Sequence, residues 1–309
     1  QGTRIAATQG RGFWALDELT VIRQLDDALA DKRLHVYAPK PTSLMRWGSW
    51  AGANEGANPP SGVVISYFIA GEVQGPLSIR VNDAQGNLVR SYSSEANDFD
   101  RCVTGNMTPR LAYTMNYPAV EPGLNQWVWD MRTEGLTCID DIRLFAGFSG
   151  ATVTPGQYSV SVSLGEHADT TDFTLSPDPR VEASPVDYAF LDTKRSETAD
   201  MLNELLTALD NARRARTRIE ALVRDNGDST VLSELSNAAI SQINAWENRV
   251  TQTGYKTYED EDSMPPMLDV HIRHVFDVID RAGPPVSEGS LQRLSDLKEQ
   301  WMAVRAELT

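Results

Sequence analysis

The sequence predicts a multidomain β + α protein, with an immunoglobulin- or fibronectin-like β-sandwich followed by an antiparallel four-helix bundle. Three observations lead to this fold class. The chain has 309 residues, which exceeds the usual size of one domain. Residues 63–175 contain short apolar runs separated by turn residues, which is typical of a β-sandwich. From Asp187 onward, apolar residues recur with a period of about 3.6, which indicates amphipathic helices.

The N-terminal segment 3–16 has the pattern of a β-hairpin, because two apolar stretches flank Gly10-Arg11-Gly12. A lone hairpin is only marginally stable in water, and its edges carry unpaired backbone groups. We therefore expect this segment to pair with strands outside the chain or to pack poorly, and we expect the native polypeptide to be longer. Residues 18–29 have helical spacing and 35–39 are extended. With the hairpin they make up the first predicted region, 1–47.

The predicted β-sandwich spans residues 58–180, and Asn58-Pro59-Pro60 marks its beginning. Residues 82–87 form a tight turn between two of its strands. Two longer loops, 93–120 and 133–154, interrupt the series of strands. The predicted strands are 63–69, 77–81, 88–92, 124–131, 157–164 and 172–175.

The two cysteines of the sequence, Cys102 and Cys138, each lie in one of these loops. A single pair of cysteines fits one disulfide in an oxidising compartment, and we predict that these two residues are bonded. Such a bond would contribute about 3–4 kcal/mol in the chain-entropy description. Two unrelated buried thiols are the alternative.

The helical bundle is predicted to span residues 187–309. Breaks between its helices fall at Asn226-Gly227, at 254–266 and at Gly283-Pro284-Pro285. Asp228-Ser229 has the residue types that cap the second helix, and Ser287 those that cap the fourth. The apolar stripes leave little room for polar chemistry, so we predict that the bundle contributes no active site. The four apolar stripes begin at Leu202, Leu232, Leu268 and Leu291.

The net charge is −15 at neutral pH, and the acidic residues are spread along the chain. An acidic surface repels nucleic-acid phosphates and anionic membrane surfaces, so we expect neither as a partner. No apolar run approaches the roughly 18–20 residues of a membrane-spanning helix. The sequence also has no nucleophile-elbow motif, no phosphate-binding loop and no dinucleotide fingerprint. We predict no catalytic residue and no cofactor.

Two pairs of residues are candidates for ligand sites. His271 and His274 share a face of a predicted helix and could bind zinc with Asp277, but a position at the helix surface or in its packing is the interpretation that we favour. Trp127 and Trp129 point to one face of a predicted strand. If they were exposed they would form a sugar-stacking platform, and if they were buried they would belong to the core.

Two clusters of charged residues need an interpretation. Arginines gather on the first long predicted helix, where ion pairs at the surface or a docking patch would explain them: Arg213, Arg214, Arg216 and Arg218. The acidic run 259–262 could attract calcium, but it lacks the glycine and the spacing of a calcium loop, so a solvated linker is the simpler interpretation.

Five short segments carry a resemblance to a known family: AATQGRGFWALD (6–17), NPPSGVVI (58–65), GLNQWVWDMR (123–132), PGQYSV (155–160) and DPR (178–180). They resemble the C-terminal region of bacterial secreted β-propeller proteins of the sortilin-like, BNR-repeat type, which are often labelled glycosyl-hydrolase-like. Most of the propeller itself has no counterpart in this chain, and Gln9 stands where the family commonly has histidine. The resemblance implies that the N-terminal hairpin closes the last propeller blade. It also implies a bacterial, extracytoplasmic location, periplasmic or secreted.

The resemblance and the residues lead to one main functional hypothesis and two alternatives. The main hypothesis is a non-catalytic structural or interaction module of a larger extracytoplasmic propeller protein. Its partner would be the propeller portion of that protein or another subunit. One alternative is an accessory part of a glycan- or peptide-processing propeller enzyme. The other is a carbohydrate-binding sandwich, which exposure of Trp50, Trp127 and Trp129 would favour.

Overall fold

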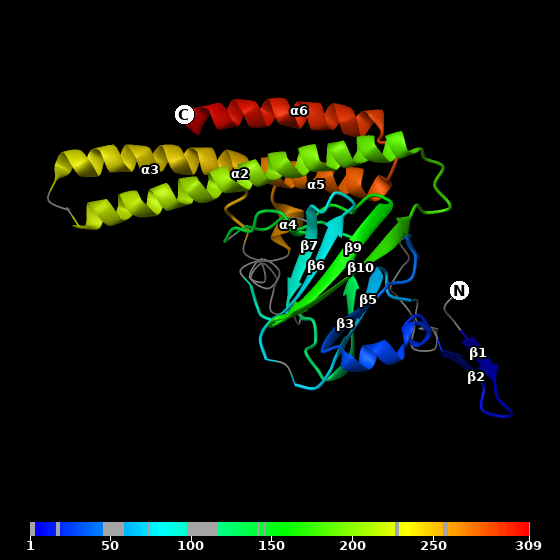
Figure 1. Ribbon diagram of the computed structural model, residues 1–309. Helices are drawn as coiled ribbons and strands as arrows, with labels where there is room; N and C mark the ends of the chain where they lie inside the picture. The colour runs from blue at the N-terminus through cyan, green and yellow to red at the C-terminus, as the bar shows by residue number, and fades with distance from the viewer. Residues whose placement is uncertain are drawn as a thin grey trace. The chain divides into compact units, whose positions relative to one another are not determined.

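The structure is a computed structural model, shown in Figure 1. It describes residues 4–16, 19–45, 59–72, 74–97, 116–140, 142–144, 146–225, 229–255 and 259–308. The chain forms two compact units. The first, rich in strands, comprises 1–97, 115–134 and 152–182, and the second contains 135–151 and 183–309. An N-terminal β region is thus followed by a helical region, as the sequence predicts.

The first unit is built on one five-stranded sheet and two small sheets. The five strands lie in the order β4-β10-β9-β6-β7, and only β4 and β10 run parallel. A three-stranded antiparallel sheet has the order β3-β5-β8. The five-stranded sheet contains β4 (Thr42–Ser43), β6 (Leu77–Asp83), β7 (Leu88–Ser93), β9 (Gly156–Leu164) and β10 (His167–Ser176). The three-stranded sheet contains β3 (Leu34–Tyr37), β5 (Val63–Ile69) and β8 (Gly123–Trp129).

Alternating apolar residues of both sheets bury into one hydrophobic core. In β5 and β9, for example, every second residue is buried, which matches the apolar alternation in the sequence. Strand β10 begins five residues earlier than predicted. Its first half is polar, and it forms a strand because its backbone pairs with β9 from His167 onward. The segment 35–39, expected as a connection, contains most of β3 and pairs with β5.

The N-terminal hairpin consists of β1 (Arg4–Ala7) and β2 (Phe13–Leu16), which form a two-stranded sheet. The expected short helix over 18–29 is instead two short 3-10 helices, Ile22–Gln24 and Asp27–Asp31.

The described part of the second unit contains four packed helices, as predicted, a short helix, α4 (Asp260–Ser263), and a short 3-10 helix, Ala306–Leu308. The predicted caps are confirmed, because the Ser229 and Ser287 hydroxyls accept hydrogen bonds from the backbone N–H groups of Leu232 and Ser290. None of the described helices is both long enough and apolar enough to cross a membrane. The four helices are α2 (Pro185–Asp225), α3 (Thr230–Val250), α5 (Leu268–Ala282) and α6 (Glu288–Arg305).

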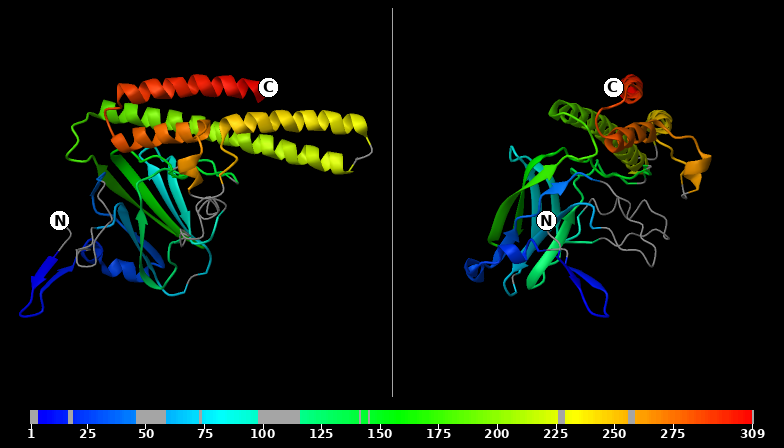
Figure 2. Two further views of the ribbon diagram at one scale, coloured as in Figure 1. Left: turned by 180° about the vertical axis from the view of Figure 1, so that it is seen from behind. Right: turned by 90° about the vertical axis from the view of Figure 1, so that its right-hand side faces the viewer.

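Helices α2 and α3 lie side by side and extend past the ends of α5 and α6, as the two views in Figure 2 and Figure 1 show. With 41 residues, α2 is about 60 Å long. The last buried residue of α2 is Ala212, which directly precedes its arginine-rich stretch. This projecting part of the α2–α3 pair begins at the arginine-rich stretch of α2.

The segment 135–151 lies between β8 and β9 in the chain, yet it folds as part of the helical unit. Apolar side chains from this segment share one core with the helices. Helix side chains also bind its backbone: Asn203 accepts a hydrogen bond from Thr137 N–H at 2.7 Å, and Arg273 donates to the Gly147 carbonyl at 2.7 Å. This segment lies within the predicted loop 133–154 of the sandwich, so its place in the helical unit differs from the expectation. The residues buried against the helices are Leu136, Ile139, Ile142, Leu144 and Phe148.

Candidate functional site

The N-terminal hairpin has large apolar side chains on both of its faces. Phe13 pairs with Ala7 and therefore lies on the same face as Ile5, whereas the neighbouring Trp14 lies on the opposite face. These three side chains are 72% (Ile5), 82% (Phe13) and 64% (Trp14) exposed. The expectation that this segment packs poorly within the chain is confirmed.

The hairpin nevertheless has a well-defined turn. Gly10 and Gly12 have φ angles of 78° and 77°, a backbone conformation that glycine adopts without steric cost. Thr8 closes the turn, because its backbone N–H and its hydroxyl both donate to the Gly12 carbonyl, at 3.1 and 2.9 Å. No other strand among the described residues pairs with either edge of this sheet. A hairpin with free edges and two apolar faces is suited to receive further strands.

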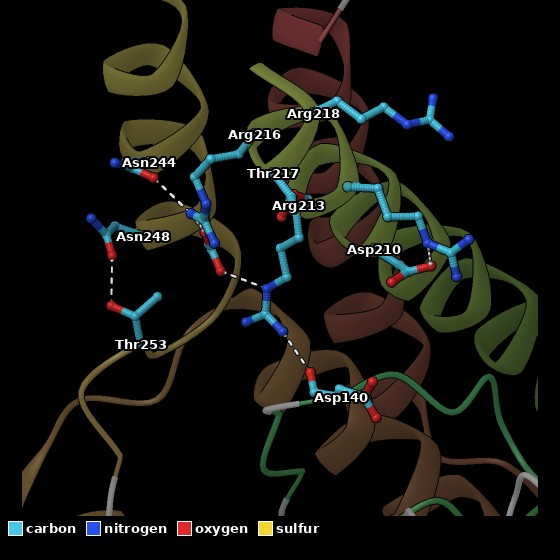
Figure 3. A pocket seen from close by; sticks show the side chains of 11 residues that line it. Asp140, Asp210, Arg213, Arg216, Thr217, Arg218, Asn244, Asn248 and Thr253 are labelled. Carbon is cyan, nitrogen blue, oxygen red and sulfur yellow. Dashed lines mark hydrogen bonds and ion pairs between the residues drawn. The ribbon is translucent and has the colours of Figure 1, made fainter. Parts of the chain in front are cut away.

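A second feature is a cavity of about 780 Å³ in the helical unit, which we call the arginine pocket (Figure 3). Its described lining consists of four arginines, three acidic residues, two asparagines and two threonines. The arginines are the four that the sequence analysis singled out on α2. Helix α2 also contributes Asp210 and Thr217 to the lining. The remaining residues come from α3, except for Asp140 and Thr253.

A buried carboxylate joins two of these arginines. Glu247 of α3 is 4% exposed, and its two oxygens accept hydrogen bonds from Arg213 Nε at 2.7 Å and from Arg216 Nη1 at 2.5 Å. Arg213 also donates to the Asp140 carbonyl at 2.6 Å, and Arg216 to Asn244 Oδ1 at 2.7 Å. A buried carboxylate that is paired on both sides fixes both guanidinium groups in place.

The other two arginines of the pocket lie apart from this group. Arg214 pairs with Asp210 one turn earlier in α2, at 2.8 Å, and its side chain is 67% exposed. Arg218 points away from Arg213 and Arg216 (Figure 3). The prediction of surface ion pairs therefore describes Arg214, while Arg213 and Arg216 form a more buried network.

The two tryptophans share one face of β8, as predicted. Trp129 is fully buried, contacts the rings of Tyr158 and Phe173, and donates through Nε1 to the Arg132 carbonyl at 2.9 Å. Trp127 is half-buried against the same core, with its ring 5.1 Å from that of Tyr92. Neither ring forms an open stacking surface. Trp50 lies outside the described residues.

The histidine pair lies on α5 at the predicted spacing. His271 is half-buried, and burial lowers its pKa, with smaller contributions from Arg293 and His274. Asp277, the third candidate, pairs with Arg281 at 2.8 Å. Within the described ranges, no group of three histidine, cysteine or acidic side chains is arranged to hold a metal ion.

The predicted disulfide involves Cys102, which lies outside the described residues, so this pairing stays a prediction. Cys138 is in the segment 135–151 and packs, half-buried, against the core of the helical unit.

The arginines of the pocket stand out in the sequence, but their partners on α3 do not. On the predicted second helix, Glu247 and Asn248 follow Asn244 by three and four residues. This spacing places both of them on the same face of the helix as Asn244. In an antiparallel helical hairpin, that face can meet the arginine face of the preceding helix. This spacing was the available signal, but it does not say which faces pack together.

Comparison with known proteins gives no family for this chain: no family model matches the sequence, and no curated protein matches it.

Proposed function

We propose that this chain is a non-catalytic interaction module of a larger extracytoplasmic protein, and that its N-terminal hairpin completes a β-sheet with strands from outside these 309 residues. The exposure of Ile5, Phe13 and Trp14 in a two-stranded sheet is the observation that carries the proposal. Strands that are buried on both faces read as apolar on both faces. The hairpin is apolar on both faces. It therefore fits a sheet that is covered on both faces better than a sheet that has one face in solvent.

The partner that we infer is the propeller portion of the same protein, of which the hairpin would close the last blade. The segment 6–17, which contains most of the hairpin, is the longest of the segments that resemble secreted propeller proteins. Within this proposal, the two sheets that share a core correspond to an immunoglobulin- or fibronectin-like sandwich, and the four helices to an antiparallel bundle. Another subunit that supplies the strands is the alternative partner.

Complex formation tests this proposal. The 309-residue chain is mixed with the polypeptide encoded immediately upstream of Gln1, and the mass of the product is measured by size-exclusion chromatography with light scattering. We expect a 1:1 complex. In hydrogen–deuterium exchange, the backbone amides of β1 and β2 should become at least about 100-fold better protected in that complex, since strand pairing protects amides.

Matched variants give this test its specificity. The double substitution Phe13→Ser and Trp14→Ser should abolish the complex, while Leu88→Ser, which changes an exposed residue of β7, should leave it intact. Equal binding by the double variant, or a hairpin that exchanges equally fast with and without the upstream polypeptide, would contradict the proposal.

A further inference from the structure

The side-chain acceptors that α3 contributes to the arginine pocket already accept hydrogen bonds from donors of the protein itself. Both carboxylate oxygens of Glu247 and the side-chain oxygen of Asn244 already accept hydrogen bonds from Arg213 or Arg216. The side-chain oxygen of Asn248 accepts one from the Thr253 hydroxyl at 2.8 Å. These acceptors are therefore occupied by the protein itself.

Several donors remain. Arg216 makes its contacts through Nη1, so its Nε and Nη2 have no partner in the described part of the chain. The side-chain NH₂ groups of Asn244 and Asn248 are also unpaired within the described residues. Arginine presents its donors in a planar fork that matches the oxygens of a carboxylate or phosphate. An oxyanion is the chemistry that these leftover donors favour.

The residues that line the pocket indicate the size and polarity of the rest of the ligand. Every described residue that lines the pocket is polar or charged, and none is aliphatic or aromatic. A cavity of about 780 Å³ has the size of a small-molecule site, which is about 300–1,000 Å³. An apolar ligand would leave the polar groups of this lining without hydrogen bonds, whereas hydroxyl groups could exchange hydrogen bonds with the asparagine and threonine side chains.

From these features we propose that the arginine pocket binds a sugar acid or a sugar phosphate, whose carboxylate or phosphate group is held by Arg216. Asn244 and Asn248 donate to the same group or to neighbouring hydroxyls. The site is preorganised, because Glu247 fixes the Arg216 guanidinium from within the protein and Thr253 fixes the Asn248 side chain. The pocket is a site separate from the hairpin and does not depend on the proposed function.

Four probes test the ligand chemistry by isothermal titration calorimetry on the 309-residue chain at low ionic strength. They are glucuronate, glucose 6-phosphate, glucose and inorganic phosphate. We expect one of the two charged sugars to bind at least about tenfold more tightly than both glucose and inorganic phosphate. Tighter binding of glucuronate identifies a carboxylate ligand, and tighter binding of glucose 6-phosphate a phosphate ligand. Added salt should weaken the binding, because exposed charges are screened.

Two variants locate the binding. Arg216→Gln removes the proposed fork, and Asn248→Asp adds a negative charge with almost the same shape while keeping the acceptor for Thr253. Each should weaken binding of the preferred probe at least about tenfold. Arg224→Gln, an exposed arginine on the same helix but outside the lining, is the matched control and should bind like the wild type. Circular dichroism checks that each variant keeps its helices.

Three results would overturn the proposal. The first is no saturable binding of either charged sugar. The second is inorganic phosphate or glucose binding as tightly as the preferred charged sugar. The third is unchanged binding in a folded Asn248→Asp variant. This variant tests the proposal even if Arg216→Gln fails to fold.

Discussion

At the scale of single residues, the helical unit buries charged side chains that the apolar stripes in its sequence do not predict. Arg195 and Asp280 form an ion pair at 3.0 Å, and their side chains are only 5% and 2% exposed. Asp269, at the start of α5, is fully buried, and its Oδ2 has no hydrogen-bond partner within the described residues. Burial raises the pKa of Asp269 to about 6, although Thr251, the Val270 N–H and Arg213 act in the opposite direction.

The raised pKa of Asp269 predicts how stability changes with pH. The folded state holds its proton up to about pH 6, whereas the unfolded chain releases it near pH 4, so stability falls as the pH rises between these values. The loss is on the order of 3 kcal/mol above about pH 6. Asp269→Asn removes this loss, so we expect the variant to be about 1–3 kcal/mol more stable than the wild type at about pH 7.5.

Urea unfolding at about pH 4 and at about pH 7.5 measures this effect. The two proteins should be nearly equal in stability at the lower pH, where Asp269 is protonated in the folded state. Asp200→Asn, at an exposed position of α2, is the control and should not change the pH dependence. If the Asp269→Asn variant retained the wild-type dependence on pH, another group would be responsible.

At the scale of elements, the segment 135–151 shows how helices can stabilise a stretch without regular secondary structure. A buried arginine of α5 donates hydrogen bonds to two backbone carbonyls of this segment. Arg273, 2% exposed, donates through Nε to the Gly147 carbonyl at 2.7 Å and through Nη2 to the Ala146 carbonyl at 2.9 Å. Phe148, next in the chain, is buried in the core.

Replacing this arginine tests how strongly the segment is held. Arg273→Met keeps the apolar bulk but removes two charged hydrogen bonds, so we expect a loss of about 2–3 kcal/mol in the free energy of unfolding. Arg281→Met, on the same helix, removes an exposed ion pair with Asp277 and should cost less than about 1 kcal/mol. Equal losses in the two variants would mean that the contacts to Ala146 and Gly147 contribute little. Chemical denaturation provides both values.

At the scale of the whole molecule, the two units are interleaved in sequence. The chain leaves the strand-rich unit after Glu134 and returns to it at Thr152. The two ends of this excursion meet, because Arg132 and Thr152 form an antiparallel bridge within the strand-rich unit. A cut at the visible boundary near residue 183 therefore does not separate the units cleanly.

This interleaving predicts the behaviour of a shortened chain. Residues 1–182 alone would leave Leu136, Ile139 and Phe148 without the helices that cover them, so this fragment should bind the dye ANS and aggregate. A second fragment, with 135–151 replaced by a short Gly/Ser linker, should stay monomeric, since the bridged ends need only a short connection. ANS fluorescence and light scattering distinguish the two. Similar aggregation of both fragments would contradict the assignment of 135–151 to the helical unit.

The sequence by itself determined the local elements of this protein. The strand β5 has the predicted bounds, the four helices occupy the predicted stretches, and Ser229 and Ser287 cap the helices as expected. These features depend on side-chain alternation, helical periodicity and capping chemistry, all of which act within a few residues. The start of α2 was placed two residues late, because the reciprocal contacts between Ser184 and Asp187 were not recognised as a capping box.

Only the tertiary structure decided which distant side chains meet. The arginines of α2 were visible in the sequence, but their enclosure by Glu247 and Asn244 depends on the rotation of α3 against α2. The segment 135–151 has no periodic pattern, so nothing local shows that its apolar residues pack with helices rather than strands. Trp129 was placed on the correct face of its strand, but its burial depended on the second sheet. Local patterns fix the direction of a side chain, whereas its partners depend on how separate elements pack.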